Sequence, residues 1–212
     1  MNKIVKKSAS YILENVKFIN KTVRVLRNTP ADQRVLWRML LLEHLPKNSI
    51  CAEVGVWKGA FSRKILKYTK PKRLYLIDPW RFQPKFSIRK YGGKDVKSQR
   101  EMDKIYNDVK KSLGTYDRVK IIRDYSNEAS DKLEEDLLDW VYIDGNHNHE
   151  YVKKDLKIYR NKVKSGGYIS GDDYLWGDKK GLPVKRAVDE FVRQNEKAEL
   201  ESIFQNQYLI KK

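Results

Sequence analysis

The sequence has one cysteine, Cys51, among its 212 residues, and it has no long hydrophobic run. A single thiol excludes an intramolecular disulfide framework and favours a reducing compartment. A membrane-spanning helix needs about 18 consecutive apolar residues, and no stretch comes near that length. The first lysines of the chain are followed by Tyr11, Glu14 and Lys17, which interrupt the apolar core of a signal peptide. We therefore expect a cytoplasmic protein without a transmembrane segment.

Acidic residues are scarce relative to basic ones. The chain has 45 Lys and Arg against 28 Asp and Glu, which gives a formal net charge of +17. Such a charge attracts nucleic acid, anionic membranes or acidic substrates. The basic residues are spread along the chain and form no block, so simple solvation of the charges explains them equally well. Hydrophobic residues make up 40% of the chain, which is typical of a folded domain.

Apolar residues recur at helical spacing between residues 3 and 27, with Lys and Arg on much of the remaining surface. This pattern predicts an amphipathic helix within residues 1–29, which the Pro-containing stretch Asn28-Thr29-Pro30 ends. Such a helix packs on its own domain, forms a homo-oligomer contact or lies on an anionic membrane. Its apolar face has Phe18 but no Trp, which favours packing over membrane contact. We expect this extension to precede one domain over residues 30–212.

Short apolar runs alternate with amphipathic helices from Ile50 onward, which is typical of βα units around a parallel sheet. Before them, a helix is expected to begin near Ala31 and to end before Pro46. The expected strands are near 50–54, 73–77, 118–122, 139–143 and 167–171. The expected helices are near 58–69, 97–113, 126–134, 149–162 and 183–195. Two closing strands, near 198–204 and 207–211, are expected to form an antiparallel hairpin.

The connection from Pro79 to Lys97 is long and rich in aromatic residues, among them Trp80 and Phe86. Long connections within compact domains are usually functional lids or disordered segments. The aromatic content, next to the end of a predicted strand, favours a lid.

A glycine turn follows the first predicted strand, in the sequence C-A-E-V-G-V-W-K-G from Cys51 to Gly59. Its spacing does not match the dinucleotide fingerprint G-x-G-x-x-G, because an acid, Glu53, stands two residues before Gly55. That acid would repel a pyrophosphate but suits a cationic amino group. Asp78 ends the next predicted strand, where a carboxylate can hold two ribose hydroxyls.

The ordered set E-V-G-V-W-K-G, L-Y-L-I-D, Y-I-D-G-N-H and G-G-Y-I-S-G-D-D-Y resembles the class I S-adenosylmethionine-dependent methyltransferases over about residues 50–212. The resemblance implies an α/β Rossmann-like fold, with a seven-stranded, mostly parallel sheet whose last strand is antiparallel, preceded by the N-terminal helical extension. It also implies S-adenosylmethionine as cofactor. The cofactor-binding residues it implies are Glu53, Gly55, Gly59, Asp78, Asp124 and Ser126. For Asp124 and Ser126, helix capping explains the residues nearly as well as cofactor contact does.

Carboxylates end two further predicted strands: Asp144 follows one, and the pair Asp172-Asp173 follows the next. Adjacent carboxylates repel unless a cation neutralises them, and oxygen ligands suit Mg²⁺. The pattern resembles the metal-dependent O-methyltransferases that modify sugars of macrolides and other natural products. This resemblance implies that Asp144, Asp172 and Asp173 are metal ligands. Catechol O-methyltransferases have acids at similar strand ends, which leaves aromatic diols as an alternative acceptor class.

His147, three residues after Asp144, matches the general base of the sugar-modifying enzymes. Histidine is the side chain best suited to proton transfer near neutral pH, and a metal would lower the pKa of the acceptor hydroxyl. Some relatives have Asp at the position of Asn146, so an Asp base is not available there. His149 is the second candidate, although a surface or helix-capping role is favoured for it.

These observations predict an S-adenosylmethionine-dependent O-methyltransferase, assisted by Mg²⁺, that acts on a hydroxyl of a sugar or glycoconjugate. Nucleic-acid methyltransferases often carry an Asn-Pro-Pro-Tyr-like run after the fourth strand, and this chain has Asp144-Gly145-Asn146-His147 there. Because of the positive charge, an RNA-binding or RNA-modifying protein remains an alternative to the sugar O-methyltransferase. An assembly subunit whose methyltransferase fold has lost catalysis is a third hypothesis.

Overall fold

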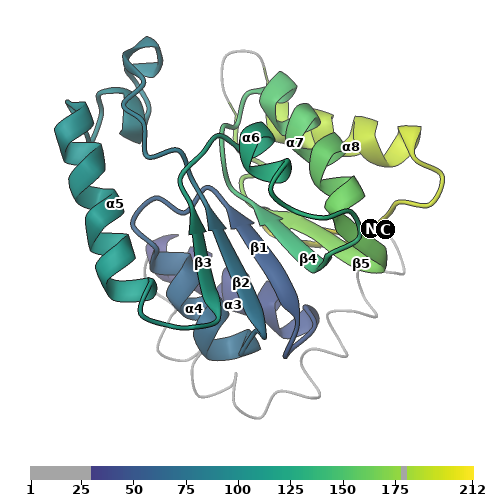
Figure 1. Cartoon of the computed structure of the whole chain (residues 1–212). Coiled ribbons are helices and arrows are strands. Elements are labelled where there is room, and N and C mark those ends of the chain that lie inside the picture. The colour runs from purple at the N-terminus through teal and green to yellow at the C-terminus, as the bar shows by residue number, and fades with distance from the viewer. Residues whose placement is uncertain (1–29, 178–180) are drawn as a thin grey trace.

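The computed structural model describes residues 30–177 and 181–212, which form a seven-stranded sheet between two layers of helices (Figure 1). The strand order is β3-β2-β1-β4-β5-β7-β6. The first five strands pair in parallel, and β7 is antiparallel to both β5 and β6. The strands are β1 (Ile50–Val54), β2 (Arg73–Ile77), β3 (Val119–Ile122), β4 (Leu138–Ile143), β5 (Val163–Gly171), β6 (Glu199–Phe204) and β7 (Gln207–Lys211). The predicted fold class is confirmed.

Two hydrophobic cores cover the two faces of the sheet, because neighbouring strand residues point in opposite directions. In β4, Val141 packs into one core and Tyr142 into the other. The first core includes apolar residues of α6, α7 and α8, and the second includes those of α3, α4 and α5. The helices are α3 (Pro30–His44), α4 (Ala60–Thr69), α5 (Gln99–Leu113), α6 (Ser126–Ser130), α7 (His149–Lys162) and α8 (Pro183–Gln194).

The observed elements differ from the predicted ones by more than two residues at two boundaries, the end of α6 and the start of β5. Helix α6 ends at Ser130, whereas the sequence pattern predicts a helix up to residue 134. The Ser130 hydroxyl donates to the Asn127 carbonyl, and such local side-chain bonds compete with the continuation of a helix. Strand β5 begins at Val163, directly after α7, because Val163 already pairs with Leu138 of β4.

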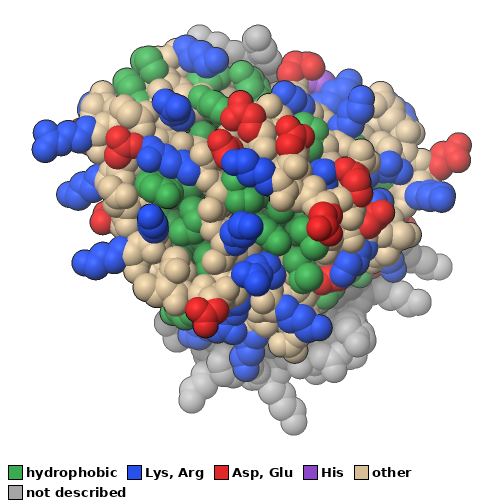
Figure 2. Space-filling model, viewed as in Figure 1, with side chains coloured by type: hydrophobic (Ala, Val, Ile, Leu, Met, Phe, Trp, Pro, Cys, Tyr) green, Lys and Arg blue, Asp and Glu red, His purple; other side chains and the backbone are tan. Residues whose placement is uncertain are grey.

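The predicted N-terminal amphipathic helix lies outside the described residues, so it and the boundary at residue 30 stay predictions. Within the described part of the chain, no helix combines the length and the apolar character that crossing a membrane requires. The aromatic connection 79–97 is ordered and contains two short 3₁₀ helices, η1 (Pro84–Phe86) and η2 (Lys90–Gly92). Lysine and arginine side chains are scattered over the face seen in Figure 2, with acidic side chains between them.

Candidate active site

A cavity of about 660 Å³ lies at the carboxyl ends of the parallel strands β1, β2 and β4. This is the edge at which open α/β sheets bind ligands. The connection 79–97 forms part of its wall. Of the residues singled out in the sequence, the cavity is lined by Glu53, Gly55, Asp78, Asp124, Ser126, Asp144, His147 and Asp173. Gly59 and Asp172 lie outside this lining.

Gly55 lets the ends of β1 and β4 come close together. Its φ is +93°, and a Cβ at this position would lie 2.1 Å from the backbone oxygen of Asp144. The Gly55 N–H donates to the Ile77 carbonyl, which also ties the turn to β2. Glycine is therefore required here by both its conformation and its contacts. Gly59 has φ +71° at the N-terminus of α4, where a Cβ would meet the Leu113 side chain, so packing favours glycine here too, and its predicted contact with the cofactor stays a prediction.

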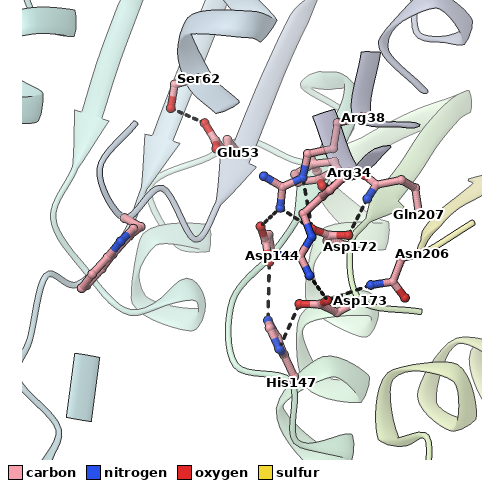
Figure 3. A network of polar contacts seen from close by, with 12 residues as sticks. Arg34, Arg38, Glu53, Ser62, Asp144, His147, Asp172, Asp173, Asn206 and Gln207 are labelled. Carbon is pink, nitrogen blue, oxygen red and sulfur yellow. Dashed lines mark hydrogen bonds and ion pairs between the residues drawn. The ribbon is translucent and has the colours of Figure 1, made fainter. Parts of the chain in front are cut away.

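Glu53 is almost completely buried and accepts a hydrogen bond from the Ser62 hydroxyl, at 2.5 Å (Figure 3). Burial raises the pKa of Glu53 to about 8, although the Ser62 hydrogen bond favours the ionised form. A buried carboxyl of this kind is held neutral until a cation arrives to pair with it. The site is thus suited to bind a positively charged group of a ligand.

Asp78 is fixed at the end of β2 by two backbone amides. Its carboxylate oxygens accept hydrogen bonds from the N–H groups of Trp57, at 2.9 Å, and Trp80, at 2.7 Å. Both tryptophans have positive φ, 54° and 41°, and the Trp80 indole donates to the Trp57 carbonyl. Strained backbone of this kind persists where the surrounding structure holds it in place, often at ligand sites. A carboxylate has further lone pairs beyond those two bonds, so Asp78 can still accept hydroxyl groups from the cavity.

Asp124 and Ser126 line the far end of the cavity, after β3. Asp124 pairs with Lys132 at 2.5 Å. The Ser126 hydroxyl donates to Asp155 of α7, also at 2.5 Å, and burial raises the pKa of Asp155 to about 6. Asp155 is a site residue that the sequence interpretation missed. The sequence does contain a sign of this role, because Asp155 lies on the apolar face of α7 beside Leu156, where a charged residue is unusual.

The acidic residues at the ends of β4 and β5 are joined by arginines from α3 (Figure 3). Nη2 of Arg38 donates to Asp144 at 2.7 Å and also contacts Asp172, and its Nε donates to Asp172 at 3.1 Å. Gln207 donates to the other oxygen of Asp172, so both carboxylate oxygens of this residue have partners. Burial works against ionisation of Asp144, but the charge of Arg38 outweighs it and lowers the pKa of this carboxyl.

His147 lies between two of these carboxylates. Its Nε2 is 3.4 Å from Asp144 and its Nδ1 is 3.2 Å from Asp173. Burial disfavours the imidazolium, but the hydrogen bond and charge of Asp144, with the charge of Asp173, outweigh it and raise the pKa of His147. Asp173 also accepts from Asn206 and faces Arg34 at 3.7 Å. This arrangement orients an imidazole that can take up a proton.

Asp144, His147 and Asp173 each offer one ligand atom within 4.8 Å of the others, which is compatible with a metal ion. Asp172 is not in this group, since its carboxylate is directed at Arg38 and Gln207. The resemblance implies Asp172 as a ligand; the group that the described residues bring together has the imidazole of His147 in its place, and metal binding by any of these side chains stays a prediction. His149 lies apart from this group, beside the carboxylates of Glu150 and Glu190.

The profile of a family described as "Methyltransferase domain" matches residues 52–174, which is more than half of the chain. No curated protein matches the sequence. Among solved structures, the O-methyltransferase NovP is similar, with 19% identity and a TM-score of 0.59; the alignment covers 85% of this chain and 80% of NovP.

Two other similar structures span most of the chain. A protein from Corynebacterium glutamicum has 14% identity and a TM-score of 0.59, with coverage of 98% and 96%. The Aeropyrum pernix fibrillarin, solved with bound S-adenosyl-L-methionine, has 12% identity and a TM-score of 0.52, with coverage of 84% of this chain and 73% of fibrillarin. At these identities the likeness is one of fold, and it agrees with the family match. The chain therefore belongs to the methyltransferase domain family, within the class I S-adenosylmethionine-dependent methyltransferases.

Proposed function

We propose that this protein is an O-methyltransferase that moves a methyl group from S-adenosylmethionine to a hydroxyl of a sugar or glycoconjugate. The observation that carries the proposal is the placement of His147 between Asp144 and Asp173, at the cavity that Glu53 and Asp78 also line. An oriented imidazole is suited to remove a hydroxyl proton.

The cofactor half of the cavity matches the chemistry of S-adenosylmethionine. Glu53, buried and neutral when alone, would ionise on pairing with the ammonium of the methionine part. Asp78 would accept the ribose hydroxyls with the lone pairs that its two backbone contacts leave free. Ser126 and Asp155 would lie at the adenine end. When bound, the cofactor supplies an electrophilic methyl group on a sulfonium.

His147 would take the proton from the acceptor hydroxyl as the methyl group is transferred. The neutral hydroxyl is a poor nucleophile, so removal of its proton in the transition state lowers the barrier. Asp144 and Asp173 would stabilise the imidazolium that results, in the way that a carboxylate orients a catalytic histidine. Arg38 keeps Asp144 ionised for this task.

We also propose that a divalent cation assists the reaction. Asp144 and Asp173 would hold it, with His147 as the nitrogen ligand, and it would lower the pKa of the acceptor hydroxyl. With a metal bound to one ring nitrogen, only the other nitrogen of His147 could accept the proton. Two carboxylates with one imidazole suit Mn²⁺ or Fe²⁺ as well as Mg²⁺, which prefers oxygen ligands.

The test is methyl transfer by the full chain to three acceptor panels: glycosides and sugar phosphates, catechols, and RNA. We expect O-methylated sugars, detected by mass spectrometry, with loss of activity in His147→Ala and retention in His149→Ala. Reactions with EDTA, and with Mg²⁺ or Mn²⁺ restored, test the metal separately. Full activity in EDTA would show that the reaction needs no metal, with His147 still the proposed base. Methylation of catechols or RNA alone would replace the proposed acceptor class.

A further inference from the structure

The wall of the cavity formed by residues 79–97, the lid, is strongly basic. It contains six Lys and Arg residues, namely Arg81, Lys85, Arg89, Lys90, Lys94 and Lys97, against one acid, Asp95. Four of the six line the cavity: Arg81, Arg89, Lys90 and Lys94. No carboxylate in residues 30–177 or 181–212 forms an ion pair with any of these four side chains. Their charge is therefore available to a ligand.

The carboxylates of the same cavity are, by contrast, already engaged. Asp144 pairs with Arg38, Asp124 pairs with Lys132, and Asp173 faces Arg34. Asp78 accepts two backbone N–H groups, and Asp155 accepts from the Ser126 hydroxyl. These acids of the cavity are thus paired with cations or hydrogen-bonded, whereas the four cations that the lid contributes have no carboxylate partner among the described residues. This separation gives the lid side of the cavity an excess of positive charge.

Arg89 connects the lid to the proposed base. Its guanidinium carbon lies 4.2 Å from the ring centroid of Trp176, and that ring meets His147 edge-on, with centroids 5.6 Å apart. An arginine stacked by its flat face keeps the N–H groups at its edge free for a planar or tetrahedral anion. Arg89 is partly buried, so a bond made there is less exposed to water than one on the surface.

We infer that the acceptor is a phosphate-bearing sugar, whose phosphate or diphosphate is bound by Arg89 with Arg81, Lys90 and Lys94. This inference rests on the proposed function, since it names the acceptor of the same site. Four unpaired cations match a group that carries two or more negative charges better than they match a single carboxylate. With the phosphate held at Arg89, the attached sugar would extend past Trp176 toward His147.

The test is calorimetric titration of the full chain, saturated with S-adenosylhomocysteine, with glucose 1-phosphate and pyrophosphate as probes. Glucose and glucuronate are the neutral and carboxylate comparisons. We expect both phosphates to bind and the other two to bind at least about tenfold more weakly. Arg89→Gln should weaken phosphate binding about tenfold or more, the usual size for loss of a charge-assisted hydrogen bond. Lys85→Gln is the matched control, since Lys85 belongs to the lid but does not line the cavity.

Equal binding of the phosphates to Arg89→Gln, Lys85→Gln and the unmodified protein would overturn the inference, as would tighter binding of glucuronate. Circular dichroism checks that both variants are folded. The two proposals fail separately in this design. Methylation of neutral glycosides without phosphate binding would support the proposed O-methyltransferase activity and contradict the proposed phosphate-bearing acceptor. Arg89-dependent phosphate binding without methyl transfer to any hydroxyl would support the phosphate site and contradict the O-methyltransferase activity.

Discussion

Nη2 of Arg38 lies 2.7 Å from a carboxylate oxygen of Asp144, and the same guanidinium bonds Asp172. One side chain of α3 therefore joins the ends of two neighbouring strands. With Arg34 beside Asp173, two arginines face three aspartates, so most of the negative charge that a metal would neutralise is balanced by the protein itself. The acidic strand ends therefore have a structural role.

The contact of Arg38 with Asp144 and Asp172 is expected to stabilise the folded protein. Arg38→Met removes the cation but keeps much of the apolar stem, which leaves Asp144 and Asp172 without their partner. We expect a loss of about 3–5 kcal/mol in the free energy of unfolding, the usual result of breaking a buried ion pair. Urea unfolding at neutral pH measures it. Arg63→Met is the control, because the Arg63 guanidinium bonds only a hydroxyl and backbone carbonyls. An equal, small effect of both substitutions would contradict the structural role of Arg38.

Glu53 predicts a pH dependence of stability in the cofactor-free protein. Its pKa is about 8 in the folded chain against an ordinary value of 4.5. Between these two pH values the folded state therefore binds a proton that the unfolded state has lost. Stability should therefore fall as the pH rises from 4.5 to 8, by an amount on the order of 3–5 kcal/mol. Glu53→Gln should remove this part of the dependence and make the cofactor-free protein more stable at pH 8.

Unfolding curves at pH 5 and pH 8 measure the effect. The same variant should bind S-adenosylmethionine more weakly, because it has lost the partner of the ammonium. A variant with unchanged pH dependence and unchanged cofactor affinity would show that Glu53 is neither held neutral nor used for binding.

His147 is predicted to titrate above the ordinary histidine value of 6.5, since Asp144 and Asp173 favour its imidazolium. NMR titration can follow it, because the chain has only three histidines. Asp173→Asn should lower the pKa of His147. A base must be neutral to act, so the acidic limb of the pH–rate profile should move to lower pH in this variant. A profile that stays in place while the NMR titration shifts would remove His147 as the base.

Gly55 is predicted to tolerate no side chain. Gly55→Ala adds a Cβ 2.1 Å from the Asp144 carbonyl oxygen in a backbone with positive φ. Gly166→Ala is the matched control, because Gly166 also has positive φ, +75°, but nothing within 4 Å of the added Cβ. Backbone strain of about 1–2 kcal/mol is common to both, and the clash should add about 1–3 kcal/mol at Gly55. Equal melting temperatures would show that the close approach of β1 and β4 is not a constraint.

Much of the fold could be predicted, because hydrophobic periodicity marks the strands and helices directly. Glu53, Asp78 and Asp144 could be assigned to one site for a similar reason: the carboxyl ends of parallel strands meet at one edge of a sheet. The partners of these residues could not be found in this way. Arg38 is 106 residues from Asp144 in the sequence, and nothing in a helical pattern shows which strand end a helix faces.

The pair Asp172-Asp173 shows a second limit. Both aspartates follow the end of β5, and Asp173 has φ +59°, so the chain leaves the extended conformation there and the two side chains point in different directions. Asp172 turns to Arg38 and Gln207, whereas Asp173 turns to the cavity and His147. The sequence pattern predicts both as ligands of one ion, because spacing alone does not give side-chain direction.

The most direct test of the account is the product of methyl transfer from S-adenosylmethionine to the panel of glycosides and sugar phosphates, determined by mass spectrometry with the unmodified chain, His147→Ala and His149→Ala. We predict a methyl group on a sugar oxygen, formed by the unmodified chain and by His149→Ala, with the rate reduced about 10²–10⁴-fold in His147→Ala. Methylation of a nitrogen, or O-methylation at an unchanged rate in His147→Ala, would contradict it.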